Sequence, residues 1–193
     1  MSIQQSIILN SFDVCGGNSM ILKRITILVL FLISTAGVTA EIETSSTTST
    51  LSFSGQHAGR DFTGVFNSWN ATLVLPPSED VSIQATFEVS SAETGNTLYD
   101  ETLTEDDWFA AEKHPIATFT STSIESTSLG YKVIGTLVLR GKSDTVEFEL
   151  KETKDGLIAD FSIDRLAFGI GEESDPTAEW VSQKIGLQLT IKQ

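Results

Sequence analysis

The feature that most constrains this chain is an alternation of apolar and polar residues with a period of two. The alternation is clearest over residues 81–89, where every second residue is apolar and the residues between are Ser, Gln, Thr and Glu. Because successive side chains of a strand point to opposite faces, this pattern predicts a strand with one buried face. Similar alternation recurs along the chain, over residues 51–53, 62–66, 69–75, 116–124, 131–139, 146–150, 157–163 and 185–191.

Short connections separate these segments, among them the turn signals Pro76-Pro77 and Asp155-Gly156. Eight or nine short strands joined in this way predict an all-β fold, either an antiparallel sandwich or a closed barrel. Residues 41–50 are rich in Ser and Thr, which indicates a flexible lead-in or a weak first edge strand.

One helix is expected between the strands. Thr104 has the features of an N-cap and Asp107 stands three residues on, where a capping box places its acidic residue. The helix would continue through Trp108 and Phe109, and Pro115 would end it. A second short helical turn is expected at Asp175-Pro176.

The first 40 residues have the order of a secretory signal. Lys23 and Arg24 precede an apolar run at residues 25–33, and small residues lead to Ala40. We expect cleavage near Ala40 and a periplasmic or secreted mature domain over residues 41–193, with an uncleaved anchor as the alternative. Residues 1–19 have the character of an upstream extension, so translation could start at Met1 or Met20.

Composition argues against several classes of function. The chain has 26 acidic and 12 basic residues, a net charge of -14, which disfavours nucleic acid and anionic membranes as partners. Its one cysteine, Cys15, lies before the expected cleavage site, and its two histidines, His57 and His114, are isolated. No nucleophile motif or phosphate-binding loop is present, so we expect neither a metal site, a resident cofactor nor enzymatic activity.

The face expected to point inward mixes large and small side chains. The large residues are Phe53, Phe66, Phe87, Leu137, Phe148 and Phe161, and the small ones are Gly64, Ala85, Gly135 and Ala159. A small barrel is either filled by its side chains or holds one small ligand. The pattern leaves both interpretations open.

Four segments, in order, resemble the YceI-like family of lipocalin-like, isoprenoid-binding secreted proteins. They are residues 53–66 (FSGQHAGRDFTGVF), Asp107-Trp108-Phe109 with Pro115 and Phe119, residues 135–141 (GTLVLRG) and residues 164–171 (DRLAFGIG). The resemblance implies an eight-stranded antiparallel, lipocalin-like barrel with one or two short helices and a helical lid. It also implies a lumen for a long-chain isoprenoid, either a polyprenyl phosphate or a quinone.

The resemblance also implies ligand contacts. With the inward aromatic residues, the apolar candidates are Phe53, Phe66, Phe87, Trp108, Phe109, Phe119, Leu137, Phe148, Phe161 and Phe168. Arg140 and Arg165 are the charged members of the matching motifs, and one of them would meet a polar head group at the barrel mouth. The alternative for Arg165 is a structural pair with Asp164.

The sequence therefore predicts a periplasmic carrier or sequestering protein for an isoprenoid lipid, as a monomer or homodimer. The alternative is a non-enzymatic interaction module that partners a membrane redox protein such as a b-type cytochrome, because Gln56 and the Trp-containing motif resemble the branch associated with those cytochromes. An enzyme that acts on a lipid-like substrate is the third hypothesis.

Overall fold

A computed structural model describes residues 41–192. Strands dominate it, with one α-helix and two short 3-10 helices. The strands are β1 Glu41–Ser45, β2 Thr50–His57, β3 Arg60–Phe66, β4 Trp69–Val74, β5 Ser82–Glu88, β6 Ala92–Glu93, β7 Ile116–Ser126, β8 Gly130–Leu139, β9 Lys142–Thr153, β10 Gly156–Asp164 and β11 Lys184–Lys192. The helices are η1 Val89–Ser91, α1 Thr97–Thr104 and η2 Arg165–Phe168.

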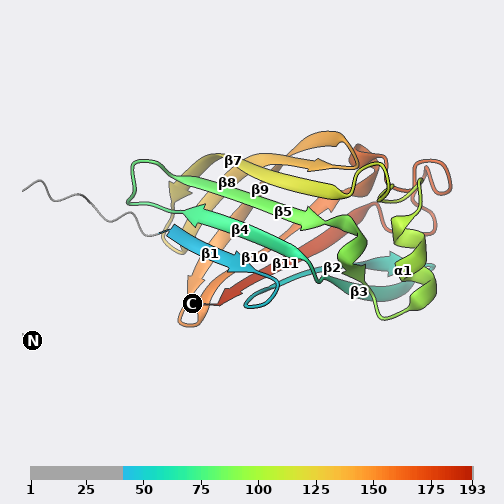
Figure 1. The fold of residues 1–193 in the computed structure, drawn as a ribbon, viewed down its shortest axis with the longest axis horizontal. Helices are drawn as coiled ribbons and strands as arrows, with labels where there is room; N and C mark the ends of the chain where they lie inside the picture. Colours follow the sequence, from blue (N-terminus) through green and yellow to red (C-terminus); the bar gives the residue numbers. More distant parts are fainter. Residues whose placement is uncertain (1–40, 193) are drawn as a thin grey trace, which may run out of the picture. The chain divides into compact units, whose positions relative to one another are not determined.

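All strands belong to one antiparallel sheet that curls around an apolar interior (Figure 1). The order is β1-β4-β5-β7-β8-β9-β10-β11-β2-β3-β6, so β1 and the two-residue β6 form the edges. The predicted all-β, barrel-like class is confirmed, but the sheet has 11 strands where eight were expected. Residues 41–45 form the weak edge strand that was one of the two expectations for this segment.

The sheet contains a boundary with few backbone pairs between β9 and β10, which we call the seam. These strands pair only over Gly156, Leu157 and Ile158, opposite residues 151–153. Along its other edge, β9 pairs with β8 over ten residues, from Lys142 to Lys151. Within residues 41–192, the rest of the β9 edge that faces β10 therefore has no strand partner.

The helix lies earlier in the chain than predicted. Asn96, rather than Thr104, is its N-cap and accepts hydrogen bonds from the backbone N–H groups of Leu98 and Tyr99. Thr104 is the last residue of α1, and the chain that follows forms turns up to Pro115. The helix prediction over residues 104–114 is wrong because the Asp107 carboxylate binds a distant loop instead of its own backbone.

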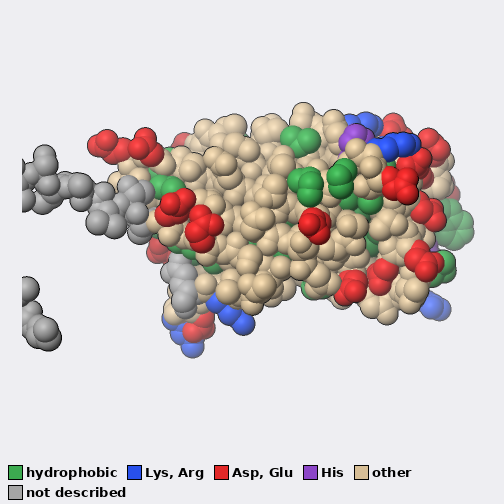
Figure 2. All heavy atoms as spheres, in the orientation of Figure 1, with side chains coloured by type: hydrophobic (Ala, Val, Ile, Leu, Met, Phe, Trp, Pro, Cys, Tyr) green, Lys and Arg blue, Asp and Glu red, His purple; other side chains and the backbone are tan. Residues whose placement is uncertain are grey.

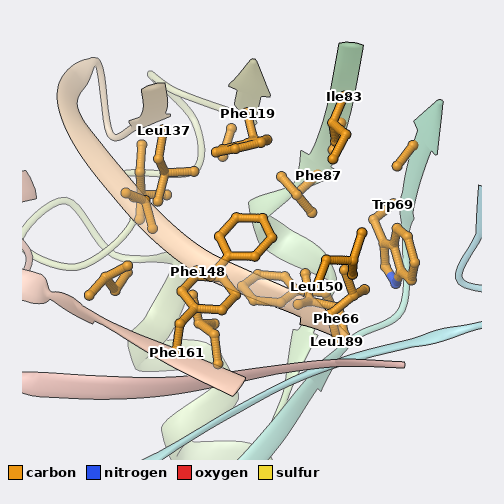
Figure 3. Close-up of a pocket in the computed structure, with 18 of the residues that line it drawn as sticks. Phe66, Trp69, Ile83, Phe87, Phe119, Leu137, Phe148, Leu150, Phe161 and Leu189 are labelled. Atoms are coloured by element: carbon orange, nitrogen blue, oxygen red, sulfur yellow. The ribbon is translucent and has the colours of Figure 1, made fainter. Parts of the chain in front are cut away.

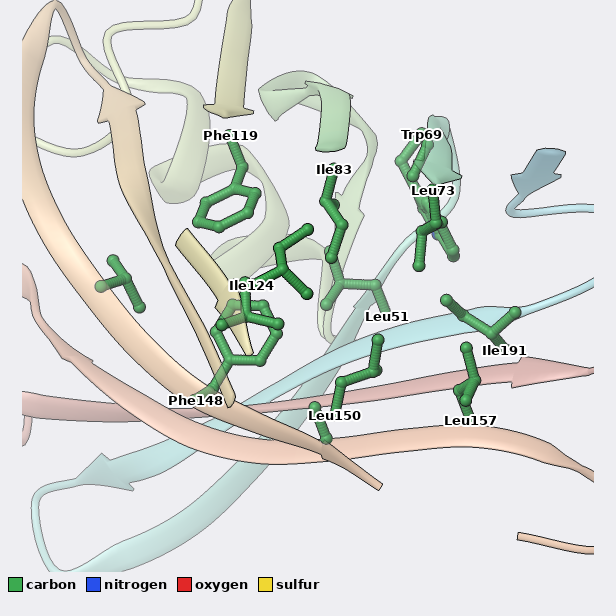
Figure 4. Packing of buried hydrophobic residues seen from close by; sticks show 14 residues of the cluster. Leu51, Trp69, Leu73, Ile83, Phe119, Ile124, Phe148, Leu150, Leu157 and Ile191 are labelled. Carbon is green, nitrogen blue, oxygen red and sulfur yellow. The ribbon is translucent and has the colours of Figure 1, made fainter. Parts of the chain in front are cut away.

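The interior holds two apolar clusters. The first occupies the main body of the barrel and includes Leu73, Val133, Leu150 and Ile191, which are almost completely buried (Figure 4). The second contains Phe53, Val89, Phe109 and Phe168 among others, and packs beside α1 through Leu103. Half-buried Phe66, Phe87 and Leu137 pack against both clusters and join them.

Among residues 41–192, no helix has the length and hydropathy needed to cross a membrane. The expected signal peptide and the choice of start codon concern residues 1–40, which lie outside the described residues.

Acidic side chains are spread over the face seen in Figure 2 rather than collected into one cluster.

Candidate functional site

The interior of the barrel encloses an apolar cavity of about 120 Å³, which we call the lumen (Figure 3). Strands β2–β5 and β7–β11 all contribute side chains to its wall, together with η1. The lining consists only of Ala, Val, Leu, Ile and Phe residues and one Trp. It therefore offers hydrocarbon contacts from every side and carries no ionisable group.

The structure brings six of the predicted ligand-contact residues together in the lumen wall. They are Phe66, Phe87, Phe119, Leu137, Phe148 and Phe161. Several of their rings are in contact: Phe119 and Phe148 have centroids 5.6 Å apart, and Phe148 and Phe161 are stacked at 4.7 Å. The inward parity read from the sequence selected five of them, and Phe119 came from the family resemblance.

Other lining residues were missing from the predicted set. They include Leu51, Trp69, Leu73, Ile83, Leu189 and Ile191. The signal that could have found them is present in the sequence, since each stands on the apolar side of an alternating segment. Trp69 is also unusual chemically, because its buried indole Nε1 has no hydrogen-bond partner among the described residues.

Two of the small inward residues do not leave free space. A Cβ added at Gly135 would overlap the ring of Phe119, and one added at Gly64 would overlap the ring of Phe53. The glycines thus allow these aromatic rings to pack directly against the sheet. Of the two interpretations that the sequence left open, these two positions follow the filled one, because the rings already occupy the space.

Phe53, Phe109 and Phe168 lie in the second cluster rather than in the lumen wall. Ring centroids are 5.3 Å apart for Phe53 and Phe66 and 6.2 Å apart for Phe66 and Phe109. We call the rings of Phe53, Phe66 and Phe109 the aromatic plug. They connect the lumen to the region beneath α1.

A second, outer pocket of about 250 Å³ lies beneath α1. Tyr99 and Leu103 from the helix form one wall, and Trp108 and Phe62 form others. His57 Nδ1 and the Tyr99 hydroxyl are 2.9 Å apart, which ties β2 to the helix. Trp108 thus contacts the outer pocket and not the lumen.

Arg165 is buried in a polar network away from the lumen wall. Only 1% of its side chain is exposed, and its Nη2 donates to Asp175 Oδ2 at 2.6 Å. Its other nitrogens donate to backbone carbonyls, including Ile170 O at 2.7 Å and Ser182 O at 3.3 Å. The guanidinium therefore fixes loops, and its ionic partner is Asp175 rather than the expected Asp164.

The carboxylate of Asp175 is held charged by this network. Burial raises its pKa, but backbone N–H groups of Val181, Trp180 and Glu179 and the charge of Arg165 outweigh burial, so the pKa lies below its ordinary value.

Asp164 instead caps η2 by accepting from Leu166 N. The expected turn at residues 175–176 is present as a hydrogen-bonded turn, not a helix.

Arg140 also holds two loops in place through hydrogen bonds from its guanidinium group. Its Nη2 donates to Asp106 O and its Nη1 to Gly169 O, both at 2.7 Å. The neighbouring Asp107 accepts from the N–H groups of Glu173 and Ser174 and from the Ser174 hydroxyl. Burial raises the pKa of Asp107, and these hydrogen bonds lower it further than burial raises it. Neither predicted arginine lines the lumen.

Among residues 41–192, no group of three or more His, Cys, Asp or Glu side chains is placed to hold a metal. The chemistry that the lumen itself offers is the exclusion of water and apolar contact.

Curated relatives match part of the chain. A UPF0312 protein of Pectobacterium atrosepticum is 30% identical over 110 residues, which covers 50% of this chain and 57% of that protein. Protein YceI of Escherichia coli O6:H1 is 30% identical over 105 residues, 52% of this chain and 54% of its own length. The matches thus span little more than half the length of these relatives.

Solved structures show the same fold over a longer range. BcnA of Burkholderia cenocepacia has a TM-score of 0.69 at 25% identity, covering 75% of this chain and 96% of that chain. The Campylobacter jejuni YceI protein has a TM-score of 0.55 at 25% identity, covering 67% and 82%. A polyisoprenoid-binding domain from Saccharophagus degradans has a TM-score of 0.59 at 15% identity, covering 78% and 95%, and shows the fold alone.

The family model described as the YceI-like domain matches residues 42–193, which is nearly the whole of the described barrel and most of the chain. This match agrees with the relatives and solved structures above. The chain belongs to the YceI-like family.

Proposed function

We propose that this protein binds an isoprenoid lipid in its lumen and carries or sequesters it as a periplasmic protein. The observation that supports the proposal is the lining of the lumen, which is apolar on every strand that contributes to it. Burial of an apolar tail stabilises a complex by about 25 cal/mol per Å² before the costs of binding are subtracted. The polyisoprenoid-binding domain from Saccharophagus degradans, with the same fold, supports the same ligand class.

The lumen is small for a long isoprenoid tail. At about 120 Å³ it is comparable to an engineered cavity of about 150 Å³ that binds benzene. Pockets for drug-sized ligands have about 300–1,000 Å³. A long isoprenoid tail therefore requires the lumen to expand, and rotation of Phe148 and Phe161 would provide space.

The outer pocket beneath α1 offers a route to the lumen. The aromatic plug lies between this pocket and the lumen, and Phe66 contacts both clusters. Movement of Phe109, which follows α1 in a turn, would open the route without breaking a strand pair. In this proposal α1 and the plug act as the lid of the barrel.

Native mass spectrometry of the protein purified from its own cell envelope, followed by organic extraction, tests the proposal. We expect an isoprenoid adduct that solvent releases. In Ala85→Leu, which fills the lumen wall, the adduct should be lost, whereas the matched variant Gln84→Leu, exposed on the other face of β5, should keep it. A clean apo mass that isoprenoids do not shift would contradict the proposal and favour the interaction module.

A further inference from the structure

We infer that the seam between β9 and β10 is the binding site for the tail of the ligand, which lies between the rings of Phe148 and Phe161 when the barrel is occupied. The inference rests on the proposed function, because it places the tail of the same lipid. It goes beyond ring rotation, since the two strands themselves would separate along their unpaired part. The closed lumen of about 120 Å³ is too small for a long tail, so the barrel has to widen.

The seam has the fewest backbone pairs of any boundary between neighbouring strands that line the lumen. Its two strands are joined by three residue pairs, over residues 156–158 and 151–153. Every other pair of neighbouring strands with side chains in the lumen wall is joined over at least five residue pairs. Widening the barrel at those boundaries would break backbone hydrogen bonds, whereas widening the open part of the seam would break none between strands.

The backbone groups along the open part of the seam have no strand partner to lose. Backbone groups of an antiparallel strand point alternately to its two neighbours, and the pairs that close the hairpins on either side of β9 fix the phase. The groups of Glu147 and Glu149 therefore point across the seam. Thr145, on the same alternation, donates its N–H to Asp144 Oδ1 at 2.8 Å instead of to a strand.

Charges on the outer face oppose closure of the seam. If the register of the paired residues continued, Glu149 would face Asp160 directly, and like charges in that arrangement destabilise a strand pair. Both side chains are exposed. On the inner face the same register aligns Phe148 with Phe161, whose rings stack at 4.7 Å and lie beside each other in Figure 3. Apolar contact thus closes the seam from inside, and an apolar chain inserted there would replace that contact with its own.

Both ends of the seam are anchored, so its middle can widen while the barrel stays closed. At one end the β9–β10 hairpin is paired. At the other end Arg140 Nη1 donates to Gly169 O at 2.7 Å, and Lys142 Nζ lies 3.0 Å from Glu172 Oε2, which ties the start of β9 to the loop after η2. The side chains of β9 and β10 that line the lumen between these anchors are all apolar. The widened seam would be an elongated apolar slit, which suits a linear tail.

Cross-links across the seam test this inference. In a Cys15→Ser background, Glu149→Cys with Asp160→Cys places two exposed thiols on opposite sides of the seam. The matched control, Asp160→Cys with Gln188→Cys, places them across the fully paired boundary between β10 and β11. A methanethiosulfonate cross-linker with a one-carbon spacer joins either pair reversibly, and peptide mapping verifies the link.

Two probes separate widening from occupancy of the closed lumen. Squalene, an isoprenoid hydrocarbon, is the long probe, and benzene, which suits a cavity of the size of the closed lumen, is the short one. We expect the seam cross-link to weaken squalene binding by about tenfold or more and a reducing agent to restore it, while the control cross-link changes it by less than about twofold. Benzene should bind all forms equally, because it does not need the seam to widen.

Spin labels at the same two pairs of positions give an independent readout without a cross-link. Squalene should lengthen the distance across the seam by roughly 4 Å, the spacing of one layer of carbon atoms, and leave the β10–β11 distance unchanged. Unchanged squalene affinity in the cross-linked seam, an equal loss in the control, or an unchanged seam distance with squalene bound would overturn the inference and leave lipid binding intact. If squalene does not bind the unmodified protein, the inference and the proposed function both fail.

Discussion

Phe148 and Phe161 stack with their ring centroids 4.7 Å apart and their planes inclined by 18°, where β9 and β10 are no longer paired. The strands pair through Ile158 and Lys151 and not beyond. Side-chain stacking therefore takes the place of backbone pairing along this seam. The same two rings line the lumen, so a substitution at either residue should affect both the seam and the shape of the lumen.

Phe161→Ala should enlarge the lumen and weaken the closed form of the barrel. Because Phe161 is only half-buried, we expect a loss of up to about 3 kcal/mol in the free energy of unfolding, at or below the usual cost of Phe→Ala in a core. Squalene should then raise the melting temperature more in the variant than in the unmodified protein. Thermal unfolding with and without squalene measures this, and an equal rise in both proteins would contradict the account.

Gly135→Ala should push the Phe119 ring into the lumen. The added Cβ would overlap that ring, and overpacking of this kind costs about 1–3 kcal/mol. We expect lower stability in urea and weaker isoprenoid binding together. Gly186→Ala is the control, because its Cβ would crowd only the exposed Ser54, which belongs neither to the lumen wall nor to the aromatic plug. An equal loss of binding in both variants would argue against a specific role for Phe119 in the wall.

Arg165→Ala should unfold the loops around η2 rather than weaken lipid binding selectively. Removal of one partner of a buried ion pair costs about 3–5 kcal/mol, and the Arg165–Asp175 pair is buried on both sides. Lys142→Ala, which removes an exposed pair with Glu172, should cost at most about 1 kcal/mol. Urea unfolding separates the two outcomes. Unchanged stability with weaker binding in Arg165→Ala would restore the head-group role.

Acid should destabilise the protein through Asp107 and Asp175. Both have a folded-state pKa below the ordinary value of 3.8, so each contributes stability that is fully present above 3.8 and lost as the pH falls through the folded pKa. The free energy of unfolding should therefore decrease with acidification in this range. Asp107→Asn should flatten the dependence. A variant with an unchanged pH profile would show that Asp107 does not contribute to it.

The strands and the lumen wall were largely predictable, because alternation is a local property. Phe87, Phe148 and Phe161 were placed correctly from parity alone. The sequence did not reveal that the rings of Phe53 and Phe119 cover Gly64 and Gly135, since that depends on which strands become neighbours.

The loop residues were not predictable for the same reason. Asp107 has the spacing of a helix cap, but its carboxylate binds Glu173 and Ser174, more than 60 residues away. Arg165 stands next to Asp164 in the sequence, yet its ionic partner is Asp175. Local spacing cannot distinguish a neighbouring partner from one that the fold brings closer.

Photoaffinity labelling with an isoprenoid that carries a diazirine in its tail tests lumen occupancy most directly. Peptide mapping should place the label on the strands that carry Phe119, Leu137 and Phe148, and Ala85→Leu should abolish it. Label confined to the exposed Leu98 and Trp180, with none inside the barrel, would contradict binding in the lumen.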